Sequence, residues 1–382
     1  MKAKPRSLVP QILGGLLLGL CVLAVSDGAV RLDIDVGDGT SVTERGDSMR
    51  VVIREGGGRL RIERRGEVEW DLGGEVTRIP TGGRLRVEQT GDGPKRYLEM
   101  RPGAGEGPEL DYRVGGSATP FDASAQGWLA DALVRVSRRT GVDADRRVDH
   151  LWGEGGSAAV LAEVEQLGSD SVTGLYLGLL LERPTLGDEE AVQALEVASR
   201  SLDSDYQLGR LLRGLSEERL VSGTVRRAAI RASASIHSDY EQSRTLKALS
   251  EGASSEALVM LLDVARSLGS DYERASLLVK IAEDETLDPA ARRAAVRTSA
   301  GIGSNYEKGR ALGALARGAD PGTLVPLLAT ARSLGSDHEL ANLLVAVAEE
   351  HPIAGDVASA FDNALAALDS EHERKRVRAA RE

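Results

Sequence analysis

The chain has 382 residues, of which 41% are hydrophobic and only 3% aromatic, and its formal net charge is −11 at pH 7. The acidic balance counts against sequence-independent nucleic-acid binding, which relies on surplus Lys and Arg to release counterions from phosphates. No nucleic-acid partner is therefore expected. The single cysteine excludes an intrachain disulfide and a four-cysteine zinc site.

The first 26 residues have the pattern of an export signal. Three basic residues precede an uncharged apolar stretch at 12–25, and Ala24 and Ser26 place small residues where a signal peptidase reads them. The apolar stretch is short for a membrane-spanning helix, which needs about 20 residues. Segment 1–26 is predicted to be a signal peptide, with an uncleaved N-terminal anchor as the alternative. Both interpretations place the protein in the periplasm or cell envelope, with membrane contact only through this segment.

Residues 30–122 are predicted to form a β-rich module. Apolar and polar side chains alternate in short segments, which are separated by turn clusters rich in Gly and Asp. This alternation predicts strands at 30–34, 49–53, 60–63, 85–88 and 97–100. Strands with charged outer faces and one buried face fit a small antiparallel sandwich or roll.

Residues 123–166 change to helical spacing. Apolar residues between Trp128 and Val136 recur every three or four positions. The segment is predicted to be a helical connector that covers the end of the repeats that follow.

A Ser-Asp-Tyr motif then recurs to the end of the chain. Its serines are spaced 32 to 35 residues apart, and periods in this range indicate a solenoid of helix pairs. The predicted fold is thus α+β and multidomain, with an antiparallel β-rich module followed by a HEAT-like α-solenoid over 167–382. The motif begins at Ser169, Ser204, Ser238, Ser270, Ser304, Ser336 and Ser370.

Each motif is predicted to begin a helix. A serine hydroxyl at the N-cap accepts from an orphan backbone N–H, and a Glu three residues later completes a capping box. In the seventh repeat Arg378 and Arg381 replace the apolar core pair, as expected of a polar terminal cap. The predicted capping residues are Ser204, Ser238, Ser270, Ser304, Ser336 and Ser370 with Glu241, Glu273, Glu307 and Glu339.

These repeats resemble the tandem Ser-Asp-Tyr helical repeats of uncharacterised exported bacterial proteins. Similar repeats also follow membrane-bound, antirepressor-type zinc metallopeptidases, and the resemblance covers about 158–382. The peptidase motif does not carry over, because His338-Glu339 is followed by Asn342 where a second zinc-binding histidine should stand. His372-Glu373 is likewise followed by Arg376. No cofactor and no metal are expected.

Two series of side chains are candidates for partner binding. The tyrosines recur in register and would form a ladder along one edge, for which packing between repeats is the alternative explanation. The arginines recur near helix C-termini, where the helix dipole or an acid of the next repeat could explain them. The two series are Tyr206, Tyr240, Tyr272 and Tyr306, and Arg200, Arg266 and Arg332.

The function expected from the sequence is that of an exported, non-enzymatic interaction or scaffold protein. Stacked helix pairs make extended binding surfaces, and no catalytic motif is assembled in the sequence. The partner would be a protein or a peptide. A sensory or regulatory ectodomain of a membrane-associated signalling or proteolysis system is the alternative, and an envelope hydrolase is the third interpretation.

The export prediction is tested by mass spectrometry of the mature protein. Cleavage after Ser26 gives a chain that begins at Asp27. A chain that retains its first residues would instead support the uncleaved anchor.

Overall fold

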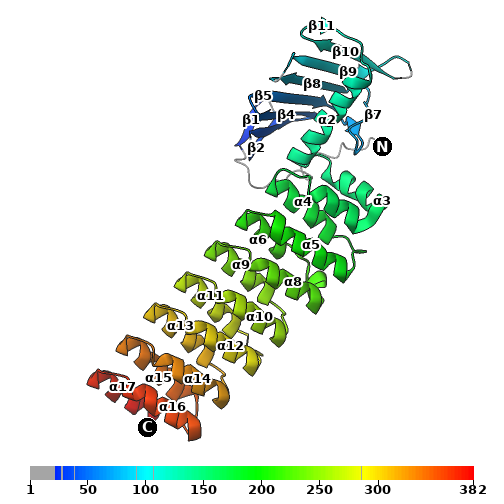
Figure 1. Ribbon diagram of the computed structural model, residues 1–382. Helices are drawn as coiled ribbons and strands as arrows, with labels where there is room; N and C mark the ends of the chain where they lie inside the picture. The colour runs from blue at the N-terminus through cyan, green and yellow to red at the C-terminus, as the bar shows by residue number, and fades with distance from the viewer. Residues whose placement is uncertain (1–21, 27–28, 38, 92, 106, 285) are drawn as a thin grey trace. The chain divides into compact units, whose positions relative to one another are not determined.

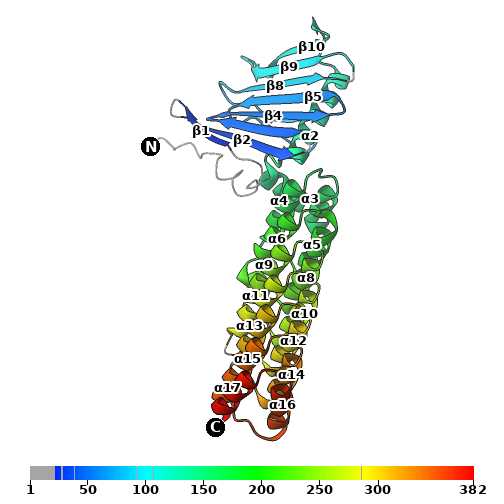
Figure 2. The same ribbon diagram turned by 90° about the vertical axis from the view of Figure 1, so that its left-hand side faces the viewer.

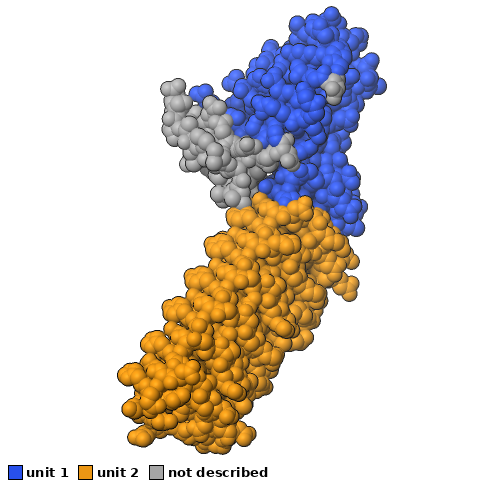
Figure 3. All heavy atoms as spheres, turned by 60° about the vertical axis from the view of Figure 1, so that its left-hand side comes forward, with its two compact units in different colours: residues 1–186 blue, residues 187–382 orange. Residues whose placement is uncertain are grey.

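The computed structural model describes residues 22–26, 29–37, 39–91, 93–105, 107–284 and 286–382, with side chains described from Gly39 onward. Residues 1–21 of the predicted signal peptide lie outside the described residues. The chain forms two compact units, residues 1–186 and residues 187–382 (Figure 3). Each unit is described by itself.

Unit 1 begins with an antiparallel sheet whose strand order is β1-β2-β3-β4-β5-β8-β9-β10-β11 (Figure 1). Seven of these strands, β3 to β11 in that order, cover residues 40–118. The five predicted strands are confirmed within β2, β4, β5, β8 and β9. The strands are β1 (Val22–Ser26), β2 (Ala29–Gly37), β3 (Thr40–Arg45), β4 (Ser48–Glu55), β5 (Gly58–Arg65), β8 (Arg84–Thr90), β9 (Arg96–Pro102), β10 (Pro108–Val114) and β11 (Ser117–Ala118), with β6 (Glu69–Trp70) and β7 (Val76–Arg78) as a separate pair.

A helix, rather than a second sheet, covers the inner face of this sheet, so the predicted sandwich is corrected. The helix is α2 (Ala123–Thr140), whose apolar residues share one core with inward residues of the strands. Trp128 and Leu133 of the helix lie in that core with Ile62 and Leu85 of the sheet. The Nε1 of Trp70 also donates to Ser137 Oγ at 3.0 Å. Helix α2 therefore belongs to the core of the sheet, although the sequence analysis assigned it to a connector.

Unit 1 ends with two further helices, α3 (Ala144–Val164) and α4 (Asp170–Leu181), which pack against each other. Helix α4 begins after Ser169, the first serine of the repeat series, but this serine makes no side-chain capping bond.

Unit 2 consists of helices packed in two parallel stacks (Figures 1 and 2). Each helix contacts the next helix of its own stack, one repeat away, which gives the solenoid-like arrangement that the repeat predicts. A short helix, α7 (Glu217–Val221), lies between the helices of one pair. The A stack contains α6 (Asp205–Arg213), α9 (Asp239–Ser250), α11 (Asp271–Ala282), α13 (Asn305–Ala316), α15 (Asp337–Glu350) and α17 (Glu371–Arg381). The B stack contains α5 (Asp188–Ser201), α8 (Gly223–Ser233), α10 (Ser255–Ala265), α12 (Pro289–Ser299), α14 (Pro321–Ala331) and α16 (Gly355–Ala366).

The motif serines begin every helix of the A stack. Each hydroxyl accepts from the backbone N–H three residues later at 3.3–3.4 Å, so the serine part of the capping prediction is confirmed. In the last helix, α17, Val377 is the one residue classed as buried, as the predicted polar cap requires.

The aspartate that follows each capping serine connects one repeat to the next. Asp239 accepts from two consecutive backbone N–H groups of the following turn, those of Gly269 at 2.8 Å and Ser270 at 2.7 Å. We call this pair of bonds the aspartate bridge. The same pair of bonds recurs at three other aspartates. Asp205 accepts from the N–H groups of His237 and Ser238, Asp271 from those of Gly303 and Ser304, and Asp337 from those of Asp369 and Ser370.

The aspartate bridge corrects the glutamate part of the predicted capping boxes. The N–H of a capping serine that a box would offer to its own glutamate is already donated to the preceding aspartate at Ser238, Ser270 and Ser304. Three of the four glutamates instead form ion pairs, two with the preceding A helix and one within its own helix. Glu241 pairs with Arg213 at 2.8 Å, Glu273 with Lys247 at 3.7 Å and Glu307 with Arg310, whereas Glu339 has no ion pair within the described residues.

The opposite ends of the helices are connected by buried arginines in alternate repeats. Arg226 Nη1 donates to the backbone carbonyls of Leu249 at 2.8 Å and Glu251 at 2.7 Å, at the end of the next A helix. Arg292, 66 residues later, does the same to Leu315 and Arg317. Burial lowers the pKa of both guanidinium groups. A cation that binds the last carbonyls of a helix also opposes the negative end of its dipole.

The bridge predicts two opposite stability changes. Asp239→Asn removes one of its two acceptors and its charge, and should lower the free energy of unfolding by about 1 kcal/mol. Asn305 occupies the aspartate position of α13, and among the described residues it accepts only from Gly335 N–H, at 2.8 Å. Asn305→Asp supplies a second acceptor and should raise the free energy of unfolding by about 0.5–1 kcal/mol. Urea denaturation measures both changes.

Asp263→Asn is the matched control, because Asp263 is an exposed carboxylate of α10 without an ion pair in the described residues. A control variant as unstable as Asp239→Asn would contradict the role of the bridge.

The bridge also predicts acid sensitivity. Hydrogen bonds from the N–H groups of Gly303 and Ser304 lower the pKa of Asp271 below its ordinary value of 3.8. The bridge therefore contributes its stability above about pH 4 and loses it as the pH falls through the folded-state pKa. The difference in unfolding free energy between the wild type and Asp271→Asn should be constant from pH 7 to pH 5 and shrink below pH 4. A difference independent of pH would contradict this assignment.

Candidate functional site

The candidate partner-binding residues lie along one edge of unit 2, where short turns lead from each B helix to the next A helix. Tyrosines occupy the second position of the A helices, directly after the bridge position. The arginines end α5 or cap α10 and α14. We call this the B-to-A edge, defined by Tyr206, Tyr240, Tyr272, Tyr306, Arg200, Arg266 and Arg332.

Three of the four tyrosines are solvent-exposed. Tyr240, Tyr272 and Tyr306 expose 59%, 60% and 62% of their surface, whereas Tyr206 is partly buried. Packing between repeats therefore does not account for the ladder in these three repeats. The Arg310 guanidinium lies 5.7 Å from the ring centroid of Tyr272, where a cation–π contact restricts that ring. Histidines take the tyrosine position in the last two repeats, and His338 Nδ1 lies 3.5 Å from Glu373.

The three arginines of the edge do not pair with an acid of the next repeat. Arg200, Arg266 and Arg332 are all exposed, and none makes an ion pair within the described residues. This corrects the ion-pair explanation of their 66-residue spacing. Arg244, one turn after Tyr240, is also exposed without an ion pair in the same part of the chain.

Most carboxylates near the edge are already engaged. The bridge aspartates accept backbone N–H bonds, and Glu241, Glu273 and Glu307 are paired with basic side chains. The turns themselves contribute two exposed carboxylates, Asp203 and Asp369. The edge thus presents exposed aromatic rings and unpaired cations at regular intervals.

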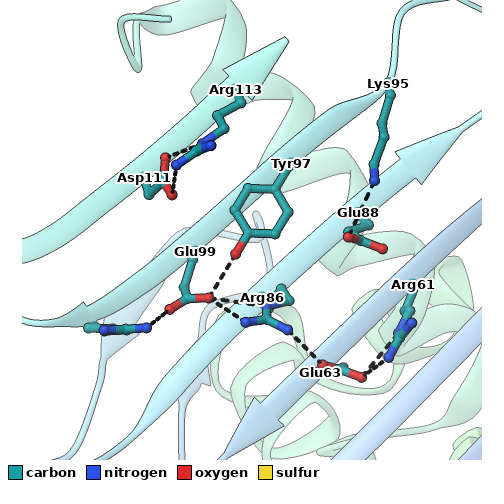
Figure 4. Close-up of polar contacts among 10 residues, drawn as sticks. Arg61, Glu63, Arg86, Glu88, Lys95, Tyr97, Glu99, Asp111 and Arg113 are labelled. Carbon is teal, nitrogen blue, oxygen red and sulfur yellow. Dashed lines mark hydrogen bonds and ion pairs between the residues drawn. The ribbon is translucent and has the colours of Figure 1, made fainter. Parts of the chain in front are cut away.

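A second charged surface, which the sequence analysis did not identify, lies on the outer face of the sheet. In its central rows arginines and glutamates alternate across the strands (Figure 4). Arg50 Nε lies 2.7 Å from Glu63, and Arg86 lies 3.7 Å from Glu63 and 2.7 Å from Glu99. The alternating charges in β4, β5, β8 and β9 were visible in the sequence, but their pairing depends on the strand register.

Glu99 is the carboxylate most strongly affected by this network. Burial of the Glu99 carboxyl favours its protonated form, but hydrogen bonds from Arg86, Tyr97 and Arg101 outweigh burial and lower its pKa to about 2. The Tyr97 hydroxyl donates to Glu99 at 2.8 Å. A carboxylate that is fully ionised and saturated with donors is suited to hold neighbouring strands together, not to accept a proton in a reaction.

Within the described residues, no group of three His, Cys, Asp or Glu side chains could hold a metal ion. No helix in the part of the chain that the structure describes is long and apolar enough to cross a bilayer.

Comparisons with protein-family models, curated proteins and solved structures returned no match to this chain.

Proposed function

We propose that the protein is an exported, non-enzymatic interaction protein that binds an extended, acidic protein segment along the B-to-A edge of unit 2. The observation that carries the proposal is the exposure of Tyr240, Tyr272 and Tyr306 to about the same degree in consecutive repeats. Isolated exposed apolar residues are ordinary, but rigid aromatic side chains repeated in register are typical of binding surfaces. The predicted export signal and the resemblance of the repeats to those of exported proteins support the proposed location.

The geometry of the edge favours an extended occupant. Packed helices lie about 8–10 Å apart, so successive tyrosines are separated by roughly that distance. An extended chain advances about 3.3–3.6 Å per residue, so every third residue of a bound segment would meet the next tyrosine. A single compact side chain of a partner could not contact two of these tyrosines at once.

The charges of the edge favour an acidic occupant. Arg200, Arg266 and Arg332 lack ion pairs within the described residues, and they recur once every two repeats. Complementary charge on the partner would speed association and fix its register. Because the bridge aspartates already accept two N–H bonds, they would compete little for these arginines.

The proposal predicts that the tyrosines can be removed without unfolding the protein. Tyr240→Ser, Tyr272→Ser and Tyr306→Ser together should change the free energy of unfolding by less than about 1 kcal/mol, because the rings are mostly solvated. The same triple variant should weaken the binding of acidic peptides with an apolar residue at every third position by at least about tenfold. Peptide arrays and urea denaturation measure the two effects.

The control is Val221→Ser, which removes an 82% exposed apolar side chain from α7 outside the B-to-A edge. Photo-crosslinking residues at 272 and 221 provide a second readout, with a peptide adduct expected only at 272. A large loss of stability in the triple variant, or adducts at both positions, would overturn the proposal.

A further inference from the structure

The outer face of the sheet in unit 1 ends in a row of arginines that differs from the balanced rows beside it. Arg45 of β3 is opposite Ser48 of β4, Ser48 is opposite Arg65 of β5, and Arg65 is opposite Arg84 of β8. We call these residues the arginine row. With neighbouring strands about 4.8 Å apart, the row spans about 14 Å.

The arginine row lacks the carboxylates that neutralise its neighbours. In the adjacent row Glu63 lies between Arg50 and Arg86. Arg45 and Arg84, by contrast, have no ion pair within the described residues, and Arg65 pairs with Asp47 at 3.5 Å, where both side chains are 62% exposed. Like charges directly opposite on neighbouring strands destabilise a sheet. A bound anion would remove this repulsion between Arg65 and Arg84.

A solvent-open hollow of about 290 Å³ lies beside the row. Its lining includes five arginines together with Thr43, Ser48 and one acidic residue, Glu63. The Glu63 carboxylate is already committed, because bonds from Arg61 and Arg50 outweigh its burial and lower its pKa. The arginines of the lining are Arg45, Arg50, Arg64, Arg65 and Arg84, of which Arg64 is buried and pairs with Asp143 at 3.2 Å. The hollow therefore combines surplus positive charge with hydroxyl groups, and its size suits a small ligand.

We propose that this hollow binds a phosphomonoester group through Arg45, Arg65 and Arg84. A phosphomonoester carries a charge of about −1.5 to −2 at pH 7 and three terminal oxygens, which matches several converging guanidinium forks. A carboxylate has one charge and two oxygens, so a single arginine satisfies it bidentately. The group belongs either to a soluble metabolite or to the headgroup of a phosphatidic-acid-like lipid. The site is independent of the B-to-A edge.

The sheet offers a matched control at the other end of the same face. Arg54 and Arg59 are also opposite each other, on β4 and β5, and both are exposed without ion pairs in the described residues. Neither lines the hollow. The variant Arg54→Gln with Arg59→Gln removes the same charge as Arg65→Gln with Arg84→Gln, but outside the proposed site.

Isothermal titration calorimetry of the full chain with glycerol 3-phosphate at pH 7.5 and low salt tests the proposal. The wild type should bind, and Arg65→Gln with Arg84→Gln should weaken binding by at least about tenfold per arginine removed. The control variant should stay within about twofold of the wild type, and acetate should compete poorly. The proposal would be overturned if glycerol 3-phosphate did not bind the wild type at concentrations up to about 10 mM, or if both double variants weakened binding equally.

Two further measurements answer separate questions: whether the phosphate group belongs to a lipid or to a soluble metabolite, and whether the arginines have a structural role. Flotation with vesicles that contain phosphatidic acid, with pure phosphatidylcholine vesicles as the control, tests the lipid source. Tighter binding to these vesicles than to glycerol 3-phosphate would identify a lipid headgroup. In either case, Arg65→Gln with Arg84→Gln should weaken binding. Urea denaturation of the Arg65→Gln, Arg84→Gln variant should show stability equal to or above the wild type, because a like-charge contact is lost. A clear loss of stability would mean that the row is structural and would contradict the site.

Discussion

The repeat architecture depends on one side-chain acceptor in each repeat, which is an aspartate carboxylate in α6, α9, α11 and α15 and the amide oxygen of Asn305 in α13. The aspartate at the first helical position lies at the positive end of its own helix, where a negative charge is stabilised. Its two oxygens accept from the N–H groups of the two residues directly before the next A helix. Orphan donors at a helix start are normally satisfied by that helix's own cap or by water. Here one of them is satisfied by the neighbouring repeat. The same bonds therefore cap a helix and fix the distance and register between repeats.

The regular edge of unit 2 follows from this constraint. Because the aspartate bridge repeats, the residue after it occupies the same place in each A helix, and in three consecutive repeats that residue is an exposed tyrosine. The A helices can vary elsewhere without disturbing the ladder. Glu241 of α9, for example, pairs with Arg213 of the preceding A helix, α6, whereas Glu307 pairs with Arg310 within its own helix. The ion pairs therefore vary from repeat to repeat, whereas an acceptor at the bridge position recurs in α6, α9, α11, α13 and α15.

The parts of this structure that the sequence predicted are those set by local interactions. A serine hydroxyl caps the helix that begins at the next residue, so Ser238 and Ser270 could be assigned from the motif alone. The partner of Asp239 lies 30 residues away, and the motif carries no sign of it. From the sequence alone, the glutamate three residues after a capping serine fits a capping box as well as it fits an ion pair. Only the stacking of helices shows that the aspartate of the preceding repeat occupies the serine N–H.

The sheet shows the same division between local pattern and tertiary register. Alternation placed the strands, and it also showed that their outer positions are charged. Whether two charges neutralise or repel each other depends on which residues face each other across strands. The register puts Glu63 beside Arg50 and Arg86, but it puts Arg65 beside Arg84 with no acid between them. A shift of one residue would exchange the two faces, so the buried core of Ile62 and Leu85 holds this register in place. Burial of the inner face thus maintains an arrangement of charges on the outer face that electrostatics alone would not favour, and such an arrangement is stabilised when an anion binds.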